Sequence, residues 1–206
     1  MENTDGKILK EKLFDGKQSG WYKLSDDELK NIFQYADEYM YYLNTSKTEK
    51  EIVKNSKEIL LKNGYVDISE KQELQAGDKI FFVNRGRCVY AAVIGEEDIE
   101  RGLRVVAAHC DSPRIDLKLN PLYEDSELAL FKTHYYGGIK KYQWTNIPLS
   151  IHGTIFKPNG EKVTICIGEK ENEPIITICD LLPHLAMEQM DRKLKDGVQG
   201  EELNPL

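Results

Sequence analysis

The sequence has few cysteines, no long apolar run and no excess of basic residues. Its 206 residues include four cysteines, none in a CxxC pair, which is typical of a protein from a reducing cytoplasm rather than a disulfide-bonded secreted one. No stretch approaches the roughly 20 apolar residues that a membrane-spanning helix needs. Lys and Arg number 28 against 35 Asp and Glu, a formal charge of −7. Because nucleic acids and anionic membranes select basic surfaces, neither is an expected partner.

Several common functional motifs are also missing. Neither glycine-rich phosphate-binding pattern, GxxxxGK[ST] or GxGxxG, occurs, and there is no GxSxG nucleophile elbow. These absences exclude the usual nucleotide-binding loops and the usual α/β serine hydrolases. Met1–Lys12 is polar and mixed in charge, so we expect no secretory signal and a cytoplasmic location.

Two segments in the first third of the chain predict helices. Each opens with a capping box, a Ser or Thr followed three residues later by Glu, and continues with apolar residues at three- and four-residue steps. The first ends near residue 43 and the second at Asn63-Gly64, where glycine favours a helix end. We expect their apolar faces in the core. The boxes are Ser25–Glu28 and Thr48–Glu51, and the apolar residues are Leu29, Ile32, Phe33, Ala36, Tyr39, Met40 and Leu43, then Ile52, Val53, Ile59 and Leu60.

From Lys79 the pattern becomes that of strands. Lys79–Val83 and Cys88–Ile94 are rich in β-formers and predict a hairpin across the four residues between them. Leu103–Ala108 is a nearly continuous apolar run, which predicts a strand buried on both faces. Helices followed by a hairpin and a buried strand indicate an α/β layer arrangement.

After Pro113 the sequence predicts a second, β-rich unit. Ile115–Leu119 alternates apolar and polar residues, as in a half-exposed strand, and Asn159-Gly160 predicts a hairpin turn. A helix is expected to begin at Pro183. Further short strands are predicted at Leu128–Phe131, Ile147–Ile155, Val163–Ile167 and Ile175–Ile178, and the inward face of the helix at Leu185, Ala186, Met190 and Leu194.

Polar side chains follow the apolar strand in the sequence AHCDSP, 108–113. Ligand sites in open α/β sheets lie beyond the carboxyl ends of strands. In extended backbone His109 and Asp111 point to the same side, so the carboxylate can hold one ring nitrogen and leave the other for a metal. The pair is either a metal ligand with its orienting carboxylate or a hydrogen-bonded structural histidine.

Cys110 lies between these two residues and is a candidate nucleophile for a cysteine-dependent hydrolase. Neighbouring residues of a strand face opposite sides, so His109 is poorly placed to activate the thiol. A buried, inert thiol is the preferred interpretation. The hydrolase alternative predicts that alkylation, and not chelation, abolishes activity.

Three other histidine-containing segments allow functional or structural interpretations. Lys132–Trp144 carries four aromatic rings, one histidine and three lysines, as in a contact surface or a loop whose rings fold back onto its own sheet. Close to the predicted helix N-terminus, His184 should be neutral, able to bind a metal or a substrate amine, or else a simple surface residue. His152 has no partner in its neighbourhood and is expected to be structural.

Five segments together resemble one family. They are similar to the zinc aminopeptidases of the aspartyl aminopeptidase and vacuolar aminopeptidase I group, and most like a bacterial member of the aminopeptidase I branch. The resemblance implies an α/β fold in which residues 1–118 are the first half of a zinc-peptidase α/β catalytic domain and residues 119–206 an inserted, β-rich dimerisation domain. The segments are AHCDSP (108–113), LKLNPLYED (117–125), KTHYYGGIKKYQW (132–144), IPLSIHG (147–153) and LLPHLA (181–186).

The resemblance also implies an activity and residue roles. The family releases N-terminal residues, often acidic ones, from peptides with two zinc ions, for which cobalt or manganese can substitute. His109 matches a metal ligand, Asp111 the catalytic carboxylate that orients it, and His184 a histidine of the inserted domain that meets metal or substrate, within reach of a neighbouring subunit's site. Peptides and further copies of the chain are the implied partners. Cys110 stands where the family more usually has Thr.

The same resemblance implies that the chain is the N-terminal half of an enzyme. The family's bridging Asp, its paired Glu residues and its other ligands follow the inserted domain, so we expect them beyond Leu206. A two-metal site needs about six to eight protein donors, and the chain alone is therefore expected to be inactive. The alternative is a non-catalytic oligomerisation or scaffold fragment, which zinc-dependent turnover by the chain would exclude.

Overall fold

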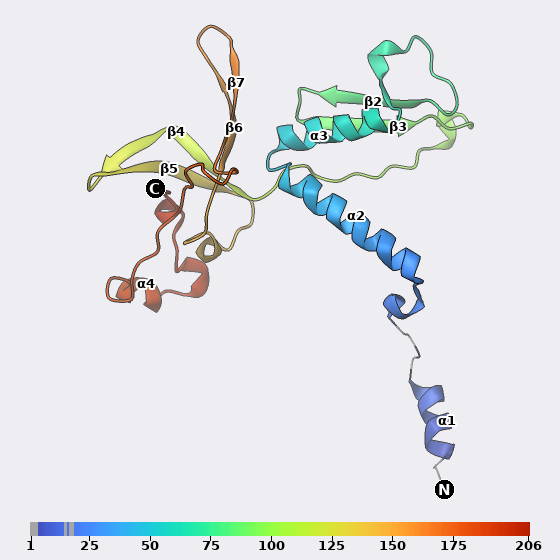
Figure 1. Ribbon diagram of the computed structural model, residues 1–206, viewed down its shortest axis with the longest axis horizontal. Helices are drawn as coiled ribbons and strands as arrows, with labels where there is room; N and C mark the ends of the chain where they lie inside the picture. Colours follow the sequence, from blue (N-terminus) through green and yellow to red (C-terminus); the bar gives the residue numbers. More distant parts are fainter. Residues whose placement is uncertain (1–3, 15, 17–18) are drawn as a thin grey trace. The chain divides into compact units, whose positions relative to one another are not determined.

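The computed structural model describes residues 4–14, 16 and 19–206, and the chain divides into two compact units, Met1–Thr45 and Ser46–Leu206. The first unit contains α1 (Thr4–Leu13) and α2 (Asp26–Asn44), and the second contains strands β1–β7 with helices α3 and α4 (Figure 1). The predicted absence of a secretory signal concerns Met1–Lys12, of which residues 1–3 lie outside the described residues. No described helix combines the length and apolar character that crossing a membrane requires.

Helix α2 forms where the sequence predicts it. Its capping box is present, with Ser25 Oγ 3.3 Å from the backbone nitrogen of Glu28 and the Glu28 carboxylate 2.8 Å from that of Ser25. The expectation that its apolar face is core is wrong: Phe33 is 62% exposed, with Trp21 6.3 Å away between ring centroids. An amphipathic face is buried only where a second apolar surface covers it, and none of the described side chains of α2 is buried.

Helix α3 (Glu49–Lys62) lies beside a small sheet, as Figure 1 shows. The predicted hairpin forms from β2 (Lys79–Asn84) and β3 (Cys88–Val93), and the two-residue β1 (Val66–Asp67) adds in parallel to β2. Val53 of α3 and Phe81 of β2 are buried, and so is Ile80, whose side chain lies on the opposite face of β2 from Phe81. The second predicted capping box, Thr48 with Glu51, is also present.

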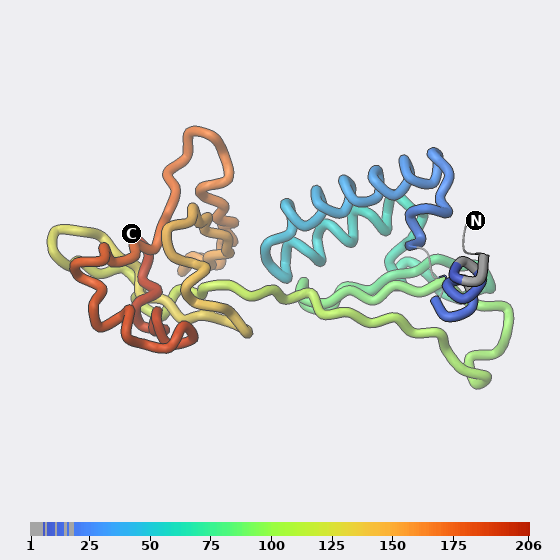
Figure 2. Tube along the Cα trace, turned by 90° about the horizontal axis from the view of Figure 1, so that it is seen from below, coloured from blue at the N-terminus to red at the C-terminus, as the bar shows by residue number. Residues whose placement is uncertain are grey.

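The predicted buried strand Leu103–Ala108 does not form within the described residues. The segment is an extended chain without a strand partner, seen in light green in Figure 2, and Val106 is 99% exposed. A strand is buried on both faces only when it has neighbours in a sheet and helices above and below. The described residues provide neither for this segment.

Two antiparallel hairpins follow. β4 (Arg114–Asp125) pairs with β5 (Leu128–Tyr136), and β6 (Ile151–Phe156) pairs with β7 (Lys162–Ile167). The turn predicted at Asn159-Gly160 joins β6 and β7, with Gly160 at a φ of 82°. The predicted strand Ile175–Ile178 is reduced to a single bridge to Leu149.

A second core lies among these hairpins and the last residues of the chain. Ile178, Val198 and Leu203 are buried, and the partly buried Ile115, Tyr135, Ile139, Tyr142, Trp144 and Leu149 pack around them. Three aromatic rings of Lys132–Trp144 therefore fold back onto their own unit. For those rings the structure supports the loop interpretation over a free contact surface.

The predicted helix at Pro183 is shorter and begins later. A turn occupies residues 183–185, and α4 (Met187–Asp191) has five residues. Of the predicted inward face only Ala186 is buried, whereas Leu185, Met190 and Leu194 are exposed. A helix of this length has no stripe long enough to cover an apolar surface.

The prediction that His152 lacks a partner is wrong, because two carboxylates hold its ring. Nδ1 lies 2.8 Å from Oε1 of Glu51, and Nε2 lies 2.9 Å from Oε1 of Glu169 and 3.1 Å from Oγ of Ser150. Burial works to lower the pKa of His152, but the hydrogen bonds and charges of Glu51 and Glu169 outweigh it and raise the pKa. The His152 ring thus ties β6 to the first turn of α3, a structural role.

We expect His152→Gln to reduce stability mainly at acidic pH. Because the pKa is raised on folding, the charged pairs stabilise fully below the unfolded histidine value of about 6.5 and are lost as pH rises through the folded pKa. Hydrogen bonds from Ser150 and His152 lower the pKa of Glu169, which keeps its carboxylate charged at the acidic end of this window. Urea unfolding should show a loss of roughly 1–2 kcal/mol at pH 5.5.

At pH 9 the loss caused by His152→Gln should be clearly smaller. The matched control is His184→Gln, an exposed histidine of the same unit, which should leave the free energy of unfolding unchanged at both pH values. Equal losses for His152→Gln at pH 5.5 and pH 9 would contradict a charged, doubly paired ring.

Candidate metal-binding site

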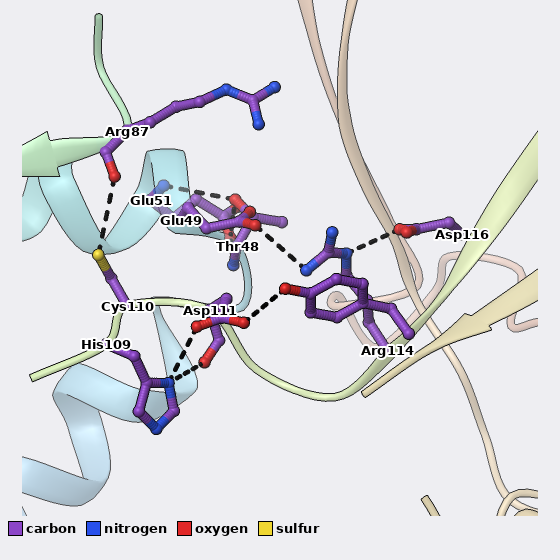
Figure 3. A network of polar contacts seen from close by, with 10 residues as sticks. Thr48, Glu49, Glu51, Arg87, His109, Cys110, Asp111, Arg114 and Asp116 are labelled. Carbon is purple, nitrogen blue, oxygen red and sulfur yellow. Dashed lines mark hydrogen bonds and ion pairs between the residues drawn. The ribbon is translucent and has the colours of Figure 1, made fainter. Parts of the chain in front are cut away.

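His109 and Asp111 are in contact at the end of the extended segment (Figure 3). Nδ1 of His109 lies 2.8 Å from the carbonyl oxygen and 3.0 Å from Oδ1 of Asp111. Both atoms are hydrogen-bond acceptors, so Nδ1 carries the proton. In the neutral ring Nε2 then has the lone pair, on a side chain that is 81% exposed. A histidine prepared in this way can bind a metal through Nε2, with Asp111 as its orienting group.

Tyr136 holds the second oxygen of this carboxylate. Its hydroxyl donates a hydrogen bond of 2.7 Å to Oδ2 of Asp111. This bond is the largest cause of a lowered pKa of Asp111, and His109 adds to it, so the carboxyl stays ionised. In the sequence Tyr136 lies within the candidate contact segment Lys132–Trp144, and no local pattern indicates this role. The signal that finds it is the β4–β5 register, which pairs Tyr136 with Arg114, three residues after Asp111.

Arg114 connects this contact to the start of α3. The carbon at the centre of its guanidinium lies 4.0 Å from the centre of the Tyr136 ring. Its Nε donates to Oδ1 of Asp116 at 2.7 Å, and its terminal nitrogen lies 3.2 Å from Oε1 of Glu49 (Figure 3). The arginine is half-buried, so these partners compensate a cation that is partly withdrawn from water.

Cys110 points away from this network. Its Sγ faces the carbonyl oxygen of Arg87 at 3.7 Å (Figure 3). Burial, followed by the influence of Cys88 and of the carboxylates Asp111 and Glu49, raises the pKa of the thiol. A protonated thiol is a poor nucleophile, which favours the inert interpretation over a cysteine-dependent hydrolase.

Comparison with known proteins identifies the family. The profile of the family described as "Aminopeptidase I zinc metalloprotease (M18)" matches residues 42–205, well over half of the chain. The chain belongs to the M18 family. The resemblance found in the sequence is therefore confirmed. The chain is a member of a family of zinc metalloproteases that are aminopeptidases.

Individual relatives of the M18 chain agree with this assignment. A probable M18 family aminopeptidase 1 from Clostridium acetobutylicum is 43% identical over 193 residues, which are 92% of this chain and 42% of that protein. A crystal structure of an M18 aminopeptidase from Thermotoga maritima is 42% identical with a TM-score of 0.84, covering 93% of this chain and 41% of that one. A yeast relative described as a dodecamer shares the fold, at 23% identity and a TM-score of 0.59, over 73% of this chain and 36% of its own.

The M18 chain spans about two fifths of the length of the curated relatives that it matches. Its mixed α/β structure accordingly corresponds to part of the solved M18 aminopeptidases. The domain boundary predicted at 118/119 stays a prediction, because the two units that separate by their contacts are Met1–Thr45 and Ser46–Leu206.

His184 is not joined to the other two predicted site residues. It is exposed in the turn before α4 and is not a hydrogen-bond partner of His109 or Asp111. The predicted effect of a helix N-terminus on its charge does not apply, because α4 begins only at Met187. Within the described ranges no three His, Cys, Asp or Glu side chains come together to hold a metal. The described residues therefore bring His109 and Asp111 together and leave His184 apart from them.

Proposed function

We propose that this chain contributes a metal ligand, His109, and its orienting carboxylate, Asp111, to a two-zinc aminopeptidase that releases N-terminal residues from peptides, acidic residues included. The observation that carries the proposal is the imidazole whose Nδ1–H is held by Asp111 while Nε2 is free on an exposed side chain. Because the chain belongs to a zinc metalloprotease family, zinc is the metal that we propose for this imidazole.

His109 and Asp111 have different roles in this proposal. His109 would bind zinc through Nε2, and Asp111 would fix the ring and increase its basicity. When bound, zinc, or cobalt or manganese in its place, would supply Lewis acidity to a water molecule and a peptide carbonyl. The remaining ligands and the second metal would be held by the part of the M18 fold that relatives have and this chain does not match.

The proposal assigns residues 1–118 to the catalytic domain and 119–206 to an inserted assembly domain. The dodecamer of the yeast relative supports association between copies of the chain. His184, exposed before α4, is proposed to meet substrate or metal in a neighbouring subunit. Peptides and further copies of the same chain are then the partners.

A chimera tests this function. The matching 42% of the Clostridium acetobutylicum relative would be replaced by this chain, and hydrolysis of aspartyl, glutamyl and leucyl chromogenic substrates would be followed. We expect hydrolysis that a chelator removes and added zinc restores, and no turnover by the 206-residue chain alone. A chimera that assembles and binds zinc as the intact relative does, but hydrolyses none of these substrates, would contradict the proposal.

A non-catalytic scaffold is the second candidate. It is favoured by the absence, in the part of the chain that the structure describes, of three converging metal ligands. On this hypothesis the chimera assembles to the size of the intact relative but takes up less zinc. Zinc analysis and size-exclusion chromatography on one preparation separate the two functions.

A further inference from the structure

We propose that Tyr136 is a positioning residue for the metal ligand, and that Arg114 holds Tyr136 in place. Tyr136 would fix the Asp111 carboxylate so that it keeps His109 in the tautomer with the proton on Nδ1 and the lone pair on Nε2. The role of Tyr136 in metal binding rests on the proposed function. The contacts of Tyr136 with Asp111 and Arg114 are present without a bound metal.

The first step is the division of the Asp111 oxygens between two partners. Oδ1 faces His109 at 3.0 Å, and Oδ2 accepts the Tyr136 hydroxyl at 2.7 Å. The terminal torsion of an aspartate is broad, so a single contact leaves the carboxylate free to turn. Because the Asp111 side chain is 37% exposed, water would compete for an oxygen that Tyr136 did not hold. The second contact therefore sets the direction in which Oδ1 points.

The second step is the placement of the tyrosine. Arg114 and Tyr136 are directly opposite in the β4–β5 ladder, and the guanidinium lies over the ring at 4.0 Å. The guanidinium is fixed over the ring by two carboxylates. Its Nε lies 2.7 Å from Oδ1 of Asp116, and its Nη1 lies 3.2 Å from Oε1 of Glu49. The cation over the ring face and the two ion pairs fix one orientation of Tyr136.

The backbone after Tyr136 supports the same placement. Gly137 has a φ of 81°, a conformation that side-chain-bearing residues rarely adopt, and a Cβ there would lie 3.6 Å from Cα of Pro113. The chain thus turns immediately after Tyr136, close to Pro113, which lies two positions beyond Asp111. This turn brings the end of β5 to the segment that carries Asp111 and His109.

The consequence lies in the tautomer of His109. A histidine tautomer is set by the hydrogen bond that one ring nitrogen makes. Of the two acceptors of Nδ1–H, the carboxylate is charged and forms the stronger bond, whereas the Asp111 carbonyl belongs to the backbone and stays in every variant. Removal of the Tyr136 hydroxyl should therefore shift the tautomer equilibrium partly, and not reverse it.

The experiment measures this equilibrium by ¹⁵N NMR of the His109 ring in the full 206-residue chain, at an alkaline pH where imidazoles are neutral. Tyr136→Phe should lower the ratio of the Nδ1–H to the Nε2–H form about fivefold. Arg114→Ala should shift the ratio in the same direction, and Arg114→Lys, which keeps a cation for the ring, should return it toward the wild-type value. The matched control is Tyr123→Phe, which removes a hydroxyl from β4 outside these contacts.

A wild-type ratio in Tyr136→Phe and Arg114→Ala, with amide spectra of folded protein, would overturn the proposal. An equal shift in Tyr123→Phe would also overturn it, because the change would then not depend on the Asp111 contact. The tautomer ratio needs neither metal nor substrate, so the result is separate from the chimera assay. If the chimera is inactive but Tyr136→Phe shifts the tautomer ratio, only the proposed function is rejected. If the chimera is active but Tyr136→Phe leaves the ratio unchanged, only the role of Tyr136 is rejected.

Discussion

Replacing His109 by alanine in the chimera is expected to remove zinc-dependent aminopeptidase activity. In the proposed site His109 binds the metal through Nε2, because Nδ1 is held by Asp111 and Nε2 lies on an exposed ring. Loss of a group that only orients a metal ligand costs about 10- to 100-fold, so loss of the ligand itself should lower kcat/KM by at least about 100-fold. The zinc content of the purified protein should fall with the activity.

Two further variants make this result specific. Asp111→Ala should give a smaller loss, about 10- to 100-fold, because the imidazole remains but is no longer oriented. His134→Ala is the control, since His134 is an exposed histidine of β5 that stacks on Tyr135 and should leave zinc content and kcat/KM unchanged. A chimera with His109→Ala that keeps both the zinc content and the kcat/KM of the unmutated chimera would show that His109 is not a ligand.

Local features of this fold could be predicted from the sequence because a few neighbouring residues determine them. Both capping boxes form, since a Ser or Thr and a Glu three residues later meet within one helical turn. The Asn159-Gly160 turn forms because glycine accepts a positive φ. The contact of His109 with Asp111 belongs to the same class, as two residues with one between them on extended backbone.

Burial could not be predicted in the same way. Leu103–Ala108 and the face of α2 have the pattern of core segments, yet Val106 and Phe33 are exposed. A pattern specifies that a face is apolar, whereas burial requires a second surface that covers it. The M18 relatives are more than twice as long as this chain, and such a surface is a property of the whole fold.

The interaction partners that the sequence did not predict are distant along the chain. Glu51 lies 101 residues before His152, and Tyr136 lies 25 residues after Asp111. Strand register brings Tyr136 to Arg114, and register depends on how two strands pair, which the composition of one strand does not specify. The sequence therefore predicted the contact of His109 with Asp111, but not the distant residues that hold the Asp111 carboxylate and the His152 ring.

Replacing Phe81 by alanine is expected to destabilise the unit Ser46–Leu206 by about 3 to 5 kcal/mol. The ring is 2% exposed on β2, between Asp67 of β1 and Ala91 of β3 in the sheet. The Lys57 ammonium of α3 lies 5.7 Å from the ring centre, so the helix covers this face. Alanine would leave a cavity under α3 that its neighbours fill only in part. Urea unfolding followed by far-UV circular dichroism measures the loss.

Phe82→Ala is the matched control, because the next residue of β2 carries the same ring on the opposite face. Phe82 is 46% exposed and meets Tyr90 at 6.3 Å between centroids, so its removal should cost less than about 1 kcal/mol. The difference between the two variants measures which face of the sheet α3 buries. Equal losses for Phe81→Ala and Phe82→Ala would contradict the burial of Phe81 and the exposure of Phe82. They would require a cover over Phe82 as tight as the one that α3 places over Phe81.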